Sequence, residues 1–142
     1  MRGRAIFLSV RPKHAEKILL GIKTVELRRM RPSISEGDRI VIYITSPKKE
    51  IRAISIVERI IFGKPEKLWK EAKDKAGVTR NEFEEYFNGA KAGVAIYIRN
   101  VQELSFPITL STLRELWPNF MPPQSYRYIS DREFSELLRL DK

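Results

Sequence analysis

The sequence lacks cysteine altogether and contains a single histidine, His14. The absence of cysteine excludes disulfide bonds and thiolate metal sites. With one histidine, a metal site would need a cluster of carboxylates, and none stands out, so we expect no metal and no cofactor. A glycine-rich phosphate loop and the motif of a serine nucleophile elbow are also missing. These absences exclude several common classes of enzyme site.

Long apolar runs are missing too. No run approaches the roughly 18 residues that span a bilayer. The apolar stretch from Ala5 to Val10 is too short for a secretory signal and has no small-residue cleavage site. We therefore expect an intracellular, cytoplasmic protein with no membrane segment. The chain has 142 residues, the length of one ordinary domain, and we expect residues 1–142 to form it without a linker or repeat.

The positive charge is distributed unevenly along the chain. The formal net charge is +9, and residues 1–60 contain 14 Lys and Arg against 6 Asp and Glu, whereas residues 61–142 contain 13 against 12. A basic region of this kind attracts polyanions, because phosphate contacts supply most non-specific affinity for nucleic acid. The asymmetry favours RNA or a nucleotide-like ligand as the partner, although many proteins are basic for solubility alone.

Hydrophobic periodicity predicts an α+β fold. Runs rich in Ile and Val, or alternating ones, predict strands near residues 5–10, 23–29, 39–45, 51–62, 94–98 and 126–129. Helical spacing and caps predict helices at 12–20, at 111–116, after Ser130, and as a helical insertion within residues 65–89. Residues 104–108 are extended around Pro107, which suits an edge strand or a loop. We predict a mixed or antiparallel β-barrel of five or six strands with peripheral helices.

The most informative stretch is GIKTVELR, from Gly21 to Arg28. Alternation places Glu26 and Arg28 on one face of a strand whose other face is the core. A carboxylate and a guanidinium can hold each other and still bind a polar ligand, and Lys23 can reach a phosphate as a mobile charge. An exposed strand face whose charges pair for solubility explains the same pattern.

This stretch resembles the G-x-K-x-x-E-x-R signature of the ASCH domain family. The short helix before it, the turn Glu36-Gly37-Asp38 and the strand from Ile40 to Ile44 match the family's order, so the resemblance covers residues 5–62. It implies a PUA-like β-barrel that binds RNA or a nucleotide-like ligand in a basic cleft beside the first helix. Carried over by position, the cleft residues are Lys23, Glu26 and Arg28, and the nearby candidates by sequence proximity are Lys13, Arg29, Arg31 and Arg39.

The resemblance leaves catalytic activity open. Some small bacterial ASCH proteins resemble amidohydrolases that act on an acetylated cytidine, with a Lys and a Thr of the motif region and a downstream Glu carrying the reaction. This chain keeps the lysine as Lys23, but Glu26 stands at the position of that threonine, and Thr24 lies elsewhere in the strand. Losing the hydroxyl removes the expected nucleophile and argues against hydrolysis. A third hypothesis is that the basic face binds an acidic protein partner.

Three other features have competing interpretations. Trp117, Tyr126 and Tyr128 could stack on unpaired bases, but aromatic side chains of a proline-rich loop commonly pack onto the end of a barrel. Helices at 68–76 and 79–87 could form a helix-turn-helix, but Glu82 and its acidic neighbours would repel phosphates, so we expect no sequence-specific DNA reading. We expect His14 to be a surface residue of the first helix. The sequence does not predict the oligomeric state.

Overall fold

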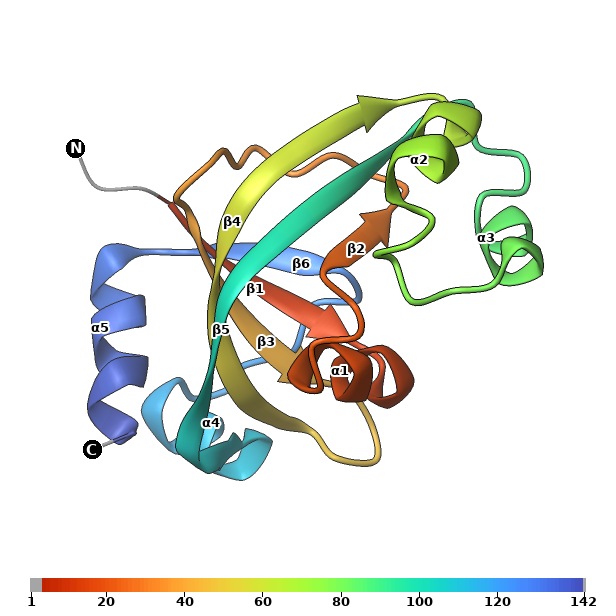
Figure 1. Cartoon of the computed structure of the whole chain (residues 1–142). Helices are drawn as coiled ribbons and strands as arrows, with labels where there is room; N and C mark the ends of the chain where they lie inside the picture. The colour runs from red at the N-terminus through yellow and green to blue at the C-terminus, as the bar shows by residue number, and fades with distance from the viewer. Residues whose placement is uncertain (1–3, 142) are drawn as a thin grey trace.

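The structure, a computed structural model, describes residues 4–141, in which six strands are interspersed with five helices (Figure 1). In chain order the elements are β1 (Ala5–Val10), α1 (Pro12–Leu19), β2 (Val25–Arg28), β3 (Arg39–Ile44), β4 (Glu50–Gly63), α2 (Pro65–Ala72), α3 (Arg80–Tyr86), β5 (Gly93–Thr109), α4 (Leu110–Leu116), β6 (Tyr126–Ile129) and α5 (Asp131–Leu140). Prolines occupy the first turns of α1 and α2, and capping boxes begin α3 and α5.

The strands form one mixed sheet in the order β2-β5-β4-β3-β1-β6. β1 and β3 pair in parallel, and the other pairings in the described sheet are antiparallel. The long strands β4 and β5 bend along their length, and the sheet curls into a half-barrel (Figure 1). This confirms the predicted α+β fold with a mixed, barrel-like sheet, and the strand number is six.

Side-chain alternation assigns each strand residue to the inside or the outside of the half-barrel. Along β1, Ile6, Leu8 and Val10 point inward and pack with α1, whereas Phe7 points outward toward α4 and α5. Both faces of β1, which lies between β3 and β6, are therefore covered, which explains why every residue of the strand except Ser9 is apolar. Along β2, Val25 and Leu27 point outward and pack with α2 and α3.

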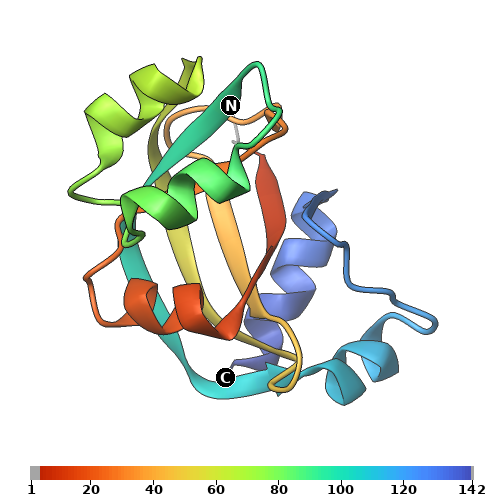
Figure 2. The same ribbon diagram turned by 90° about the vertical axis from the view of Figure 1, so that its right-hand side faces the viewer.

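The helices cover different parts of the curled sheet. Figure 2 shows α1 and α3 at the open side of the half-barrel, and α4 and α5 at the opposite end from α2 and α3. The helices α2 and α3, both within residues 65–89, pack Leu68 and Phe83 against Tyr97 and its neighbours on the outer face. That residues 1–142 form a single domain stays a prediction, and residues 1–3 and 142 lie outside the described part.

The segment around Pro107, predicted as an edge strand or a loop, is a strand, and it continues the 17-residue β5. β2 pairs with β5 only at residues 94–97, so the rest of that edge of β5 has no strand beside it in the described sheet. A proline without an N–H is tolerated at such an edge. No helix within residues 4–141 is long and apolar enough to cross a membrane.

Candidate functional site

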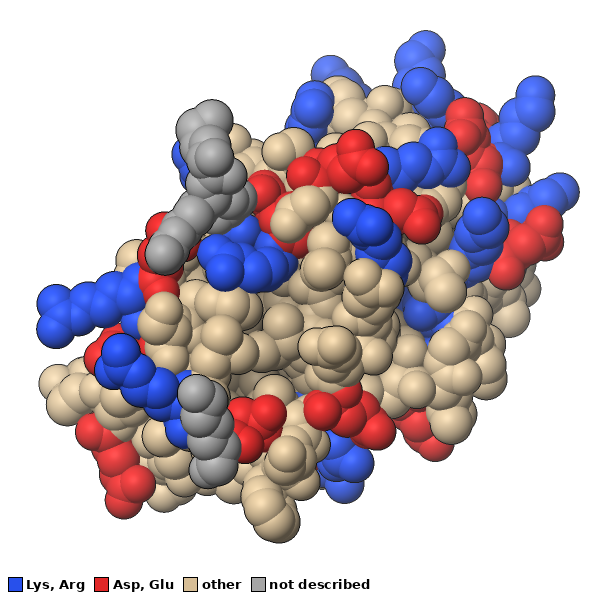
Figure 3. Space-filling view, turned by 60° about the vertical axis from the view of Figure 1, so that its left-hand side comes forward, with Lys and Arg blue, Asp and Glu red and all other residues tan. Residues whose placement is uncertain are grey.

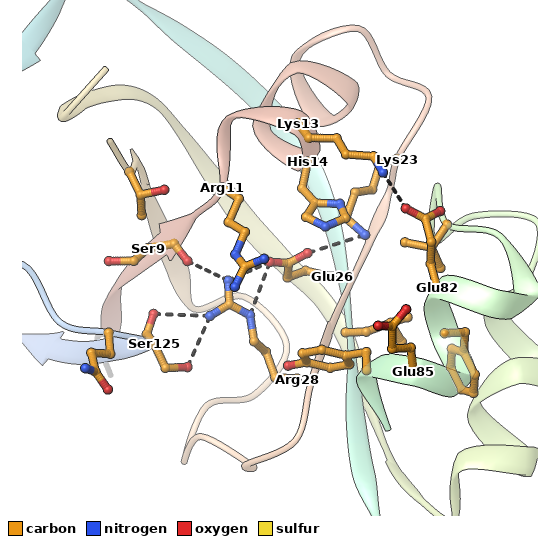
Figure 4. Close-up of a pocket in the computed structure, with 16 residues that line it drawn as sticks. Ser9, Arg11, Lys13, His14, Lys23, Glu26, Arg28, Glu82, Glu85 and Ser125 are labelled. Carbon is orange, nitrogen blue, oxygen red and sulfur yellow. Dashed lines mark hydrogen bonds and ion pairs between the residues drawn. The ribbon is translucent and has the colours of Figure 1, made fainter. Parts of the chain in front are cut away.

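A cleft of about 680 Å³ opens at the mouth of the half-barrel, between α1, β2 and α3 (Figure 4). Its walls come from the end of β1, the first turn of α1, the inward face of β2, one face of α3, and the loop before β6. Segments distant in sequence therefore meet around one cavity. Lys13, Lys23, Glu26 and Arg28, four of the residues that the sequence singles out, are among its lining residues.

Glu26 lies at the floor of the cleft and pairs with both basic residues of the motif. Its carboxylate accepts hydrogen bonds from Arg28 Nη2 at 2.6 Å and Nε at 3.2 Å, and its Oε1 lies 3.4 Å from Lys23 Nζ. Only 5% of Glu26 is exposed. Burial acts to raise the pKa of Glu26, but Arg28 and Lys23 overcome this and lower it, so the carboxylate is ionised at neutral pH. The motif is a buried ion cluster, and the interpretation of an exposed strand face is wrong.

Arg28 connects the two ends of the sheet across the cleft. Besides Glu26, it donates from Nη2 to the Ser9 carbonyl at 2.7 Å and from Nη1 to the carbonyl and hydroxyl of Ser125 at 3.3 and 3.1 Å. Ser9 belongs to β1 and Ser125 immediately precedes β6, whereas Arg28 belongs to β2 at the other edge. A guanidinium has five N–H donors, and these contacts engage all five. Arg28 therefore connects the two ends of the curled sheet, and none of its N–H donors is left for a ligand.

The Lys23 side chain is held by two contacts, so the prediction that it is a mobile charge is wrong. The residue is 2% exposed, and Nζ donates to the Ala76 carbonyl as well as pairing with Glu26. Burial lowers the pKa of Lys23, and Glu26 opposes that shift. Lys17 donates from α1 to the neighbouring Gly77 carbonyl at 2.7 Å. The two lysines thus attach the segment before α3 to the barrel, and Lys23 contributes to the base of the cleft.

The accessible charges of the cleft are Arg11, Lys13, Glu82 and Glu85. Figure 4 shows the Arg11 guanidinium directed into the cavity, and within residues 4–141 it has no ion-pair or hydrogen-bond partner. Lys13 pairs with Glu82 across the opening, from α1 to α3. The cleft therefore carries charges of both signs, and it is less basic than the sequence predicts.

His14 lines the cleft instead of lying on an open surface, so that expectation is corrected. Its Nδ1 is buried and has no hydrogen-bond partner within the described chain. Burial, followed by the positive charge of Lys23, lowers the pKa of His14. The side chain is therefore a neutral imidazole at neutral pH, beside the buried ion cluster.

The lowered pKa of His14 predicts a loss of stability in mild acid. Because the folded protein binds this proton less readily than the unfolded chain, the stability is complete above the unfolded pKa, 6.5, and falls as the pH drops toward the lower folded value. We expect urea unfolding to show a smaller decrease between about pH 7.5 and about pH 5.5 for His14→Gln than for the parent protein. An equal decrease in both proteins would show that His14 does not titrate in this range.

The other three predicted cations lie outside the cleft. Arg29 donates to the carbonyls of Tyr86 and Asn88, and Arg31 stacks on the Phe62 ring. Arg39 begins β3 and pairs with Asp131, whereas the cleft contains Thr45, just beyond the other end of β3. Of the four cations chosen by sequence proximity to the motif, only Lys13 lines the cleft.

The predicted aromatic stacking residues are also absent from the cleft lining. Trp117 packs on Phe120 and donates from Nε1 to Glu136 at 3.3 Å. Tyr126 and Tyr128 share a face of β6, with ring centroids 5.9 Å apart. The aromatic ring that does line the cleft and stays accessible is Tyr86, which is 42% exposed.

Sequence reasoning missed Arg11 and the α3 wall of Glu82, Glu85 and Tyr86. The capping box of Thr79 and Glu82 was visible in the sequence, but nothing in it indicated that α3 would face α1. Thr24 lies in a separate, smaller hollow beside β5. Within residues 4–141, no group of three or more His, Cys, Asp or Glu side chains is arranged to hold a metal ion.

Comparisons with known proteins relate this chain to a family model and to an ASCH protein. Residues 4–115 match the family model described as "Domain of unknown function (DUF365)". A Zymomonas mobilis protein named "ASCH domain-containing ribonuclease" is 34% identical over 133 residues, which are 94% of this chain and 89% of the relative.

Solved structures agree with this relationship. The crystal structure of ASCH from Zymomonas mobilis has a TM-score of 0.90 at 33% identity, covering 96% of this chain and 94% of that one. Human THYN1, solved in complex with DNA containing 5-methylcytosine, has a TM-score of 0.62 at 11% identity and covers 98% of each chain. The second likeness shows a shared fold alone.

Proposed function

Because this chain belongs to the ASCH domain family, we propose that it binds RNA in the cleft between α1, β2 and α3. The family relationship supports an RNA-related role, and the cleft supplies a site of suitable size. Its volume of about 680 Å³ falls within the range of small-molecule and nucleotide pockets.

The observation that carries the proposal is the position of Arg11. This guanidinium projects into the cleft and has no partner within the described residues, so it can donate to a phosphate or to a base edge without breaking an existing contact. Tyr86 on the opposite wall presents an exposed ring against which an unpaired base can stack. The motif residues Lys23, Glu26 and Arg28 act in this proposal by shaping the floor.

On one face of the molecule, the charge distribution favours the cleft over a general basic surface. On the face shown in Figure 3, Lys and Arg alternate with Asp and Glu around an uncharged centre, so the coloured residues there form no continuous basic patch. A polyanion held by bulk attraction would need such a patch. We therefore rank the alternative of an acidic protein partner below RNA.

Titration of labelled single-stranded and hairpin RNAs by fluorescence anisotropy tests the proposal, with protein stripped of nucleic acid. We expect Arg11→Ala to weaken binding roughly 10-fold, because one charge-assisted contact contributes about 1.5 kcal/mol. Lys73→Ala, which removes an equal charge at the exposed end of α2, should change it by less than about 2-fold. Equal losses in both variants would indicate diffuse attraction and contradict a site in the cleft.

A second candidate is cleavage of the bound RNA. It is favoured by the relative named a ribonuclease, which is 34% identical and covers nearly the whole chain. Incubation of end-labelled RNA with the protein and with Arg11→Ala, followed by gel analysis, tests it, and cleavage should slow in parallel with binding. Hydrolysis of an acylated cytidine has less support, because Thr24 lies outside the cleft and Glu26 is held by two cations.

A further inference from the structure

The ion pair between Lys13 and Glu82 crosses the opening of the cleft. Lys13 lies in the first turn of α1 and Glu82 in the first turn of α3, and Nζ of the lysine donates to Oε2 of the glutamate. The side chains are 60% and 35% exposed, so the pair is in contact with solvent. Both residues line the cleft, and Figure 4 shows the pair between α1 and α3.

Glu82 is fixed in this position by its second oxygen. Oε1 accepts the Thr79 backbone N–H at 2.8 Å, and the Glu82 N–H donates to Thr79 Oγ1 at 3.1 Å, so the residue is part of the α3 capping box. The hydrogen bond from Lys13, together with the Thr79 backbone, lowers the pKa of Glu82 to about 2. The carboxylate therefore stays ionised at ordinary pH values, and a second anion is the kind of group that can compete with it for Lys13.

We propose that Lys13 is a phosphate-binding subsite of the cleft, which the Glu82 carboxylate occupies until an RNA phosphate displaces it. The inference rests on the proposed RNA binding and names the group that receives one of its phosphates. A carboxylate oxygen and a phosphate oxygen accept the same charge-assisted hydrogen bond from an ammonium, so one can replace the other.

The neighbouring charges make this exchange favourable for a phosphodiester. Arg11, two residues before Lys13, also lines the cleft, so an RNA strand whose phosphate binds Lys13 finds a second cation elsewhere in the same cleft. Solvent-exposed ion pairs have small net free energies, so releasing Glu82 to solvent costs little. Glu82 then retains its contact with Thr79, and α3 keeps its cap.

A double-mutant cycle on RNA binding tests the inference, using Lys13→Ala, Glu82→Gln and the double variant. The Glu82→Gln change removes the charge while keeping the cap, because the new amide oxygen can still accept from the Thr79 N–H. We expect Glu82→Gln alone to strengthen RNA binding about 3- to 5-fold, because the phosphate no longer displaces a charged competitor. In the Lys13→Ala background the same change should have little effect, and the gain should shrink at high salt.

Glu133 provides a matched control. Its Oε1 accepts the Ser130 backbone N–H at 2.9 Å, and its Oε2 accepts from Arg127 at 2.6 Å, so it combines a capping box with an ion pair as Glu82 does, but away from the cleft. Glu133→Gln should leave RNA affinity within about 2-fold of the parent value.

The outcomes separate the inference from the proposed function. A gain on Glu82→Gln that depends on Lys13 supports the subsite. Equal gains for Glu82→Gln with and without Lys13, or for Glu133→Gln, would overturn it and leave only a general charge effect, with RNA binding intact. RNA binding that is undetectable in every variant would overturn both proposals.

Discussion

Arg28→Ala is expected to lower the free energy of unfolding by about 3–5 kcal/mol, the range for removing one partner from a buried ion cluster. Three effects combine in this loss. The buried Glu26 carboxylate loses its shortest contact, at 2.6 Å, and the Ser9 carbonyl loses a donor at 2.7 Å. The connection between β2 and the loop before β6 at Ser125 disappears, so the two ends of the sheet are no longer joined through this side chain.

Urea unfolding followed by circular dichroism measures this change. Arg31→Ala is a suitable control, because Arg31 is an exposed arginine three residues along the chain whose guanidinium stacks on the Phe62 ring. We expect it to cost about 1 kcal/mol or less. If Arg28→Ala were as mild as Arg31→Ala while RNA binding collapsed, Arg28 would be a ligand contact and the structural role assigned to it would be wrong.

This prediction also shows where sequence reasoning about the motif succeeded and failed. Alternation correctly placed Glu26 and Arg28 on one face of β2, opposite Val25 and Leu27. It did not reveal that a curled sheet buries both faces, because closure depends on contacts between residues far apart in sequence. Arg28 and Ser125 are 97 residues apart, and no local pattern connects them.

The same limit applies to the rest of the candidate site. Strands and helices follow from periodicity and caps, which act within a few residues, and most of them were predicted close to their observed bounds. The exception is β5, which continues to Thr109 although the prediction ended at residue 98. The lining of the cleft instead depends on how α1 faces α3, which is set by tertiary packing. Arg11 and Glu82 were therefore missed as site residues, whereas Arg39 was included because of its position in sequence although it lies at the opposite end of β3.

The dependence of the cleft on α3 leads to the second large effect. Phe83 is 3% exposed, and its ring centroid lies 5.0 Å from Trp69 and 4.7 Å from Phe87. The same residue lines the cleft and belongs to the cluster that attaches α2 and α3 to the outer face of the sheet. Phe83→Ala should lower the free energy of unfolding by about 3–5 kcal/mol, because it removes a buried ring and leaves a cavity. Phe106→Ala removes a ring that is 79% exposed and should cost about 0.5 kcal/mol or less.

Hydrogen exchange distinguishes global from local loss of structure in Phe83→Ala. The helix α3 has seven residues and is too short to persist alone, so weaker packing should expose its amides before those of the central strands. Since α3 carries Glu82, Glu85 and Tyr86, its detachment would also remove one wall of the cleft and weaken RNA binding at temperatures where the sheet stays folded. Unchanged RNA affinity in a protein whose α3 amides exchange freely would show that this wall does not contact the ligand, and binding would then depend on the α1 side of the cleft.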